Sequence, residues 1–180
     1  VATVKFSYHP VWTKEFVKQV LAGYDDAMSL INKGDSDFAK ILKLHDWIVK
    51  NVSYGMLKNA SDYAVGALAN KSAVCGGYAQ CYQFLLSQAG IKSIYVAAQT
   101  QKEPHAWNLV QYEGHWFHVD CTWDRGVGIN PTVKHDYFMK SDEEFNENGA
   151  HTEDWKAPEK NYPQGNKCTI KNKFYSDNTE

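Results

Sequence analysis

The sequence has no apolar run that approaches the ~20 residues a membrane-spanning helix needs. It has no block of lysine and arginine, and its 180 residues carry a formal net charge of −2. These absences argue against a membrane-spanning segment and against nucleic acid as a partner. It also has no internal repeat and no low-complexity linker. We therefore expect a single domain over residues 1–180, with its core at about 36–145 and a loosely ordered tail from about 176.

Cysteine is scarce. The four cysteines are too few for a disulfide scaffold, and none forms the C-x-x-C pair of a structural zinc site. Two bridges stay open on sequence grounds, Cys81–Cys121 and Cys121–Cys168. The histidines are scattered and no His/Asp/Glu spacing suggests a metal cage, while the acidic stretch "SDEEF" does not match a calcium loop. We expect no metal and no cofactor.

The apolar pattern predicts helices first and antiparallel strands afterwards, which is typical of the α+β class. Helical spacing covers three segments, namely Thr13 to Asn32, Ser36 or Asp37 to Val52, and about Cys75 to Ala89. Strand-like segments follow at 91–98, 105–112 and 115–123, and the stretch 135–145 offers a short strand and a short helix. Gly90 fits a left-handed helix cap, and Glu113-Gly114 fits a hairpin turn.

This hairpin turn fixes which residues face each other. If Glu113 and Gly114 form its centre, His105 and Asp120 lie on the same face of the hairpin as diagonal neighbours, with Cα atoms ~7–8 Å apart. That spacing lets a carboxylate hold an imidazole. A turn with an odd number of residues would shift the pairing by one and separate the two side chains.

Cys75 precedes two glycines and an apolar helix, so we expect it at a helix N-terminus. The positive end of that helix and an imidazolium from His105 would both lower the pKa of the thiol. Asp120 would fix the tautomer of His105, and the backbone N–H of Cys75 would donate to an oxyanion. These residues together supply a nucleophile, a base and an orienting carboxylate.

Four stretches of the sequence resemble the transglutaminase-like superfamily in its compact bacterial form. They are "LHDWIVKNVSY", "GALANKSAVCGGYAQCYQFLLSQAGI", "PHAWNLVQYEGHWFHVDCTWD" and "HDYFMKSDEEF". The resemblance implies a papain-like α+β fold in which N-terminal helices pack on an antiparallel sheet. It also implies that Cys75 is the nucleophile, His105 the general base and acid, and Asp120 the orienting carboxylate. Together with a chain that begins at Val1, it suggests an exported bacterial protein of the extracellular space or cell envelope.

The activity that the resemblance implies is acyl transfer from a protein or peptide amide through a thioester on the cysteine. We favour hydrolysis of the peptidase type. Transfer to an amine, which would cross-link proteins, uses the same three residues and is the alternative. A binding module with a vestigial triad is a third interpretation of another class. The substrate, the oligomeric state and any flanking domains are not indicated by the sequence.

Further candidate site residues surround these three. Gly76 and Gly77 would leave room for a substrate beside the thiol. Trp107 shares the hairpin face and either walls a cleft or simply packs, and Tyr63 is a candidate second oxyanion donor. Cys81 lies inside the apolar helix and is interpreted as core filler.

Overall fold

The computed structural model describes residues 13–56, 62–100, 103–125 and 132–146. The elements follow one another as α1 (Lys14–Met28), α2 (Asp37–Asn51), β1 (Ser53–Tyr54), α3 (Ala64–Asn70), β2 (Ser72–Ala73), α4 (Cys75–Gln88), β3 (Ser93–Gln99), β4 (Pro104–Tyr112), β5 (His115–Val119), α5 (Cys121–Asp124) and α6 (Asp142–Asn146). Helices α1 to α4 come before the three-stranded antiparallel sheet and the short helices α5 and α6 follow it, and the predicted α+β class is confirmed.

The helix starts are set by short polar side chains. Thr13 caps α1 by accepting a hydrogen bond from Phe16 N at 3.1 Å, and Ser36 caps α2 in the same way from Ala39 N at 3.2 Å. Both caps lie where the sequence predicts them. Helix α1 ends at Met28, four residues before the expected Asn32.

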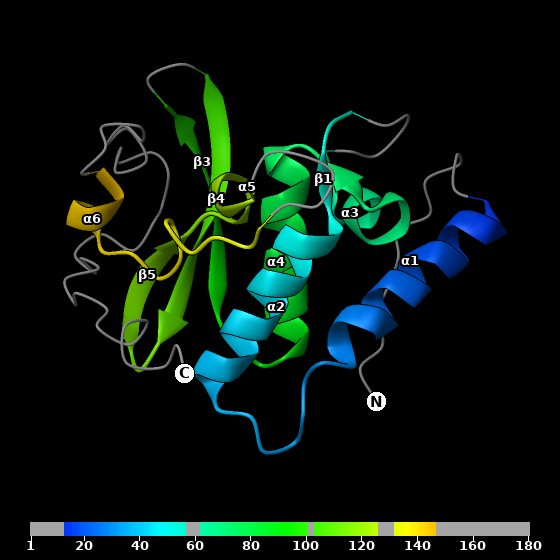
Figure 1. The fold of residues 1–180 in the computed structure, drawn as a ribbon, viewed down its shortest axis with the longest axis horizontal. Helices are drawn as coiled ribbons and strands as arrows, with labels where there is room; N and C mark the ends of the chain where they lie inside the picture. The colour runs from blue at the N-terminus through cyan, green and yellow to red at the C-terminus, as the bar shows by residue number, and fades with distance from the viewer. Residues whose placement is uncertain (1–12, 57–61, 101–102, 126–131, 147–180) are drawn as a thin grey trace.

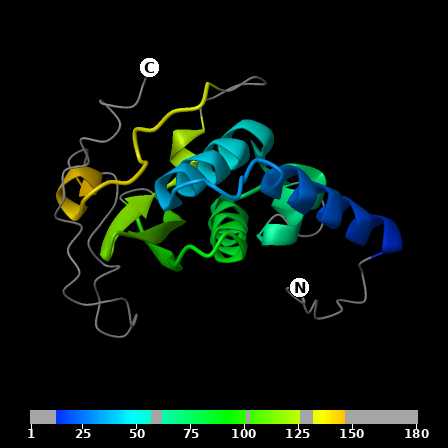
Figure 2. The same ribbon diagram turned by 90° about the horizontal axis from the view of Figure 1, so that it is seen from below.

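Helix α4 lies at the centre of the molecule, between the sheet and helices α1, α2 and α3 (Figures 1 and 2). Two buried side chains join it to its neighbours. Asn108 on β4 donates its side-chain N–H to Ala79 O at 3.0 Å, and the Tyr82 hydroxyl donates to Ile41 O on α2 at 2.9 Å. Its apolar residues Tyr78, Cys81, Tyr82, Leu85 and Leu86 lie in the core. These bonds hold α4 to the sheet on one side and to α2 on the other.

The sheet has the strand order β3-β4-β5. Tyr112 pairs with His115, as the sequence predicts, and the two residues between them have positive φ angles, 49° at Glu113 and 80° at Gly114. Two consecutive positive φ values are the signature of a two-residue hairpin turn of type I′. Because the loop has an even number of residues, the strand pairing is not shifted by one. The φ of 82° at Gly90 confirms the predicted left-handed cap after α4.

Several elements differ from the sequence prediction. Helix α3 and the short parallel pair of β1 and β2 are additional elements that we did not expect. Strand β5 ends at Val119 rather than running on to Trp123, because Asp120 starts helix α5. The strand expected within 135–145 is reduced to a single bridge between His118 and Lys140, whereas the short helix there is confirmed as α6.

In the described parts of the chain, no helix combines the length and the apolar character that crossing a bilayer requires. The predicted loose tail from residue 176 lies outside the described residues, as does Cys168.

Candidate functional site

Cys75 is the first residue of α4, as predicted, and its side chain is half-buried. Its position follows from the parallel pairing of β1 with β2, in which Tyr54 stands beside Ala73. Strand β2 then leads through Val74, whose backbone is extended, directly into the helix. The thiol is thereby placed at the positive end of the α4 dipole.

His105 and Asp120 meet at the open end of the hairpin. The His105 Nε2–H donates to Asp120 Oδ2 at 2.6 Å, and both side chains are buried. The register that places them together is the predicted one, and its ladder ends at the pair of Asn108 with Val119.

Asp120 uses its second carboxylate oxygen to begin helix α5. Oδ1 accepts from the backbone N–H groups of Thr122 at 2.9 Å and Trp123 at 3.1 Å, while the backbone N–H of Asp120 donates to Tyr137 O at 3.0 Å. The hydrogen bonds from His105, Thr122 and Trp123 hold the carboxylate in one orientation. It can therefore hold the imidazole of His105 in one orientation.

Two tryptophans enclose the His105 ring. Trp123 stacks on it with ring centroids 5.0 Å apart at 25°, and Trp107 lies at 6.0 Å and 24°. Trp107 is only 1% exposed, and its indole N–H donates to His118 Nδ1 at 3.0 Å. Of the two alternatives for Trp107, the structure supports packing rather than a cleft wall.

The thiol of Cys75 and the ring of His105 interact electrostatically. Burial raises the pKa of Cys75, but the hydrogen bond and charge of His105, with the backbone N–H groups of Ala106 and Gly76, outweigh it and lower the pKa below its ordinary value. Burial likewise lowers the pKa of His105, yet the charge and hydrogen bond of Asp120, together with Cys75, raise it to about 10. Both shifts favour the thiolate–imidazolium pair over the neutral thiol and imidazole.

Tyr54 contributes a hydroxyl to this site that the sequence analysis missed. Its oxygen accepts a hydrogen bond from the backbone N–H of Cys75. Burial, and then the charges of Cys75, Glu103 and Asp120, raise the pKa of Tyr54, so the phenol stays protonated. No local signal in the sequence marks this contact, because it depends on the pairing of β1 with β2, the strand that leads into Cys75.

The remaining predicted site residues are placed as follows. Tyr63 caps α3 with its backbone and is 58% exposed, and its role stays a prediction. A Cβ on Gly76 would lie 3.5 Å from Asp62 O and from the Tyr95 hydroxyl, which is ordinary contact. The protein itself therefore does not exclude a side chain at Gly76. Gly77 is buried, which leaves Gly76 as the glycine beside the thiol.

Cys75, Cys81 and Cys121 are all free thiols, so the bridge between Cys81 and Cys121 is not formed. Cys81 and Cys121 are fully buried, and burial raises the pKa of both, to about 12 for Cys81. They pack in the core, as expected for Cys81. A cavity of about 1000 Å³ lies elsewhere, between α1, α3, α4 and the start of β3, and its lining does not include Cys75.

The fold brings together a half-buried thiol at a helix N-terminus, an imidazole that interacts with it and a buried carboxylate that holds the imidazole. The sequence model of the transglutaminase-like superfamily matches residues 26–121, which is more than half of the chain and includes all three of these residues. The protein belongs to the transglutaminase-like superfamily.

Two curated relatives are similar in sequence. The chain is 25% identical over 133 residues to kyphoscoliosis peptidase of Mus musculus, covering 64% of this chain, and 25% identical over 139 residues to that of Homo sapiens, covering 66%. The match spans about a fifth of the length of each relative, 20% and 21%. The crystal structure of a TGase overlaps 69% of this chain and 37% of its own, with a TM-score of 0.49 and 16% identity.

Proposed function

We propose that the protein is a cysteine-dependent enzyme that cleaves protein or peptide amides through a thioester intermediate. The observation that carries this proposal is the thiol of Cys75 at the start of α4, which interacts with His105 through a hydrogen bond and charge, while Asp120 holds Nε2 of the His105 ring. These contacts support the roles of nucleophile for Cys75, general base and acid for His105, and orienting carboxylate for Asp120.

In the first half-reaction the Cys75 thiolate attacks the carbonyl carbon of the scissile amide and forms a C–S bond. His105 then gives its proton to the departing nitrogen, the C–N bond breaks and the amine leaves. The product on the enzyme is a thioester. Asp120 stays ionised throughout and stabilises the imidazolium until its proton is transferred.

The negative charge that develops on the carbonyl oxygen needs donors in place before the reaction. The backbone N–H of Cys75 is one, because it lies at the positive end of α4. We propose the Tyr54 hydroxyl as the second, since it lies beside that N–H and its raised pKa keeps the proton on the phenol. When substrate arrives, its carbonyl oxygen would take the place that the Tyr54 oxygen occupies on the Cys75 N–H.

In the second half-reaction His105, now neutral, takes a proton from water while the water oxygen attacks the thioester carbon. The C–S bond breaks, an acid product leaves, and the thiolate–imidazolium pair is restored. Two relatives named as peptidases support water as the acceptor. A primary amine in the same position would instead give a new amide, which is the transamidation alternative. A binding module would perform neither step.

The test compares wild-type protein with Cys75→Ala, and uses Cys81→Ala as the matched control because Cys81 is buried away from the reaction. Each protein is incubated with casein, with and without a fluorescent primary amine. We expect cleavage without amine incorporation by wild type and Cys81→Ala, and none by Cys75→Ala. Amine incorporation that depends on Cys75 would establish transamidation. Cleavage that survives in Cys75→Ala would overturn the proposal.

A further inference from the structure

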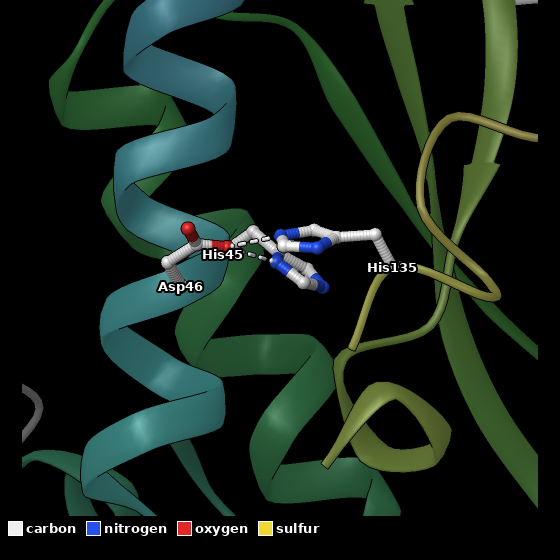
Figure 3. A group of neighbouring side chains, drawn as sticks. All are labelled: His45, Asp46 and His135. Carbon is white, nitrogen blue, oxygen red and sulfur yellow. Dashed lines mark hydrogen bonds and ion pairs between the residues drawn. The ribbon is translucent and has the colours of Figure 1, made fainter. Parts of the chain in front are cut away.

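Three side chains with metal-binding chemistry converge away from Cys75, between α2 and the segment that precedes α6 (Figure 3). His45 Nδ1 lies 2.8 Å from Asp46 Oδ1, and His135 Nε2 lies 2.7 Å from the same oxygen. The three atoms all lie within 4.8 Å of one another. His45 and His135 thus point toward one carboxylate oxygen from two separate parts of the chain.

This spacing is close to what a transition-metal ion requires. Zinc bonds of about 2.0–2.1 Å to nitrogen or oxygen place the ligand atoms of a tetrahedral site about 3.4 Å apart. The two contacts to Asp46 would have to lengthen by roughly half an ångström. The two imidazole nitrogens, which lie within 4.8 Å of each other, would have to lie about 3.4 Å apart.

The ring of His45 is already oriented as a ligand would be. Its Nε2–H donates to Asp124 Oδ2 at 3.0 Å, and both side chains are fully buried. The other oxygen of Asp124 accepts from Tyr137 N at 2.8 Å, so this carboxylate is fixed in turn. A metal-bound histidine commonly donates its second N–H to a carboxylate in this way, which directs the first nitrogen to the ion.

The charge of the cluster also favours a cation. Carboxylates face both ring nitrogens of His45, Asp46 at Nδ1 and Asp124 at Nε2. A divalent ion held by His45, His135 and Asp46 would offset this local negative charge. Access from solvent is provided by Asp46, whose side chain is 38% exposed, and by His135 at 16%.

We propose that His45 Nδ1, His135 Nε2 and the Asp46 carboxylate bind one divalent ion of the zinc class, with water completing the coordination. Two imidazoles and one carboxylate suit zinc and its neighbours rather than calcium or magnesium, which prefer all-oxygen sites. The bound ion would tie the segment around His135 to α2. This site is independent of the reaction proposed for Cys75, and it differs from the sequence expectation that no metal is bound.

The test must separate this cluster from the thiol, because Cys75 and His105 are themselves capable of binding zinc. It therefore uses the full chain with Cys75→Ser, stripped with a chelator and titrated with Co²⁺ as a spectroscopic probe and with Zn²⁺ by calorimetry. We expect one equivalent of Co²⁺ with the visible absorption of a low-coordinate site, displacement by Zn²⁺, and a rise in Tm. Adding His135→Ala should weaken binding by at least about tenfold. The matched control, His115→Ala at the exposed hairpin turn, should bind as before.

A second readout keeps the result decisive if His135→Ala fails to fold. In the Cys75→Ser protein, Zn²⁺ should shift the imidazole NMR signals of His45 and His135 and leave those of His115 in place. The proposal is overturned if Co²⁺ binds only when Cys75 is present. It is equally overturned if binding is unchanged by His135→Ala, or if the signals of His45 and His135 do not respond to Zn²⁺.

Discussion

The carboxylate of Asp120 serves His105 with one oxygen and the start of helix α5 with the other. Oδ2 accepts from His105 Nε2 at 2.6 Å, while Oδ1 accepts from two backbone N–H groups of α5. The same residue therefore ends strand β5, begins the next helix and orients the imidazole. A substitution that keeps the helix cap but removes the negative charge can therefore separate the structural role from the orientation of the imidazole.

Asp120→Asn should separate them, because asparagine caps helices as well as aspartate does but carries no charge. We expect kcat to fall by on the order of 10³-fold, since the amide neither holds the required tautomer nor stabilises the imidazolium. The Tm should change little. Asp120→Ala, which removes the cap as well, should in addition lose about 1 kcal/mol or more of stability. Full activity in Asp120→Asn would show that the charge is not needed.

Tyr54→Phe removes the hydroxyl that lies on the Cys75 N–H while keeping the ring. We expect kcat to fall by about 10²-fold with KM nearly unchanged, as for the loss of one oxyanion donor. Tyr63→Phe is the matched control, because Tyr63 was the donor candidate from sequence and its side chain is 58% exposed. Steady-state kinetics on one peptide substrate decide between them. The opposite pattern, with only Tyr63→Phe impaired, would reassign the donor.

The rate should depend on pH through the thiolate–imidazolium pair. The lowered pKa of Cys75 predicts that kcat/KM rises to its plateau below the ordinary titration range of a thiol, and the pKa of about 10 for His105 predicts loss of activity above that value. A pH profile of kcat/KM tests both limbs. A rise centred at the ordinary thiol value would mean that Cys75 is not activated.

The same shift has a consequence for stability with a defined sign. The pKa of His105 is raised from 6.5 to about 10 on folding, so its protonated form stabilises the native state. This contribution is fully present below pH 6.5 and is lost as the pH rises through about 10. Urea unfolding of wild type and His105→Gln should therefore give a stability difference that shrinks with rising pH. A difference that grows over this range would contradict the assignment.

Gly23 lies where α1 packs against α3, so substitutions at this residue test that packing. A Cβ there would lie 2.2 Å from the backbone oxygen of Leu68 on α3, so Gly23→Ala must push α1 away from α3. We expect a loss of about 1–3 kcal/mol in the free energy of unfolding, despite the better helix propensity of alanine. Gly34→Ala is the control, since a Cβ there meets nothing within 4 Å. Equal urea midpoints for the two variants would contradict the packing.

Local signals in the sequence were sufficient for the parts of the fold that local physics determines. The caps at Thr13 and Ser36 and the turn at Glu113-Gly114 depend on residues a few positions apart, and the turn alone brings His105 to Asp120. The sequence prediction missed helix α5 because it continued the alternating pattern of β5 through Asp120. Asp120 is instead the N-cap of that helix.

Contacts between distant segments were not accessible in this way. Tyr54 reaches Cys75 only because β1 pairs with β2, two strands of two residues each that are too short to show a period. His45 and His135 are far apart in the chain and meet only when the segment after α5 folds back on α2. Nothing in the spacing of His45 and His135 along the sequence predicts that contact.

The central claim, that His105 activates the thiol of Cys75, is tested most directly by alkylation with iodoacetamide at pH 6, with each cysteine quantified by mass spectrometry. An unperturbed thiol with a pKa near 8.5 is well under 1% thiolate at this pH. We predict that Cys75 is labelled at least about tenfold faster than a cysteine in an unstructured peptide. We also predict that His105→Gln abolishes this advantage although Cys75 stays half-buried. Labelling of Cys75 at the peptide rate or below, with no effect of His105→Gln, would contradict the claim.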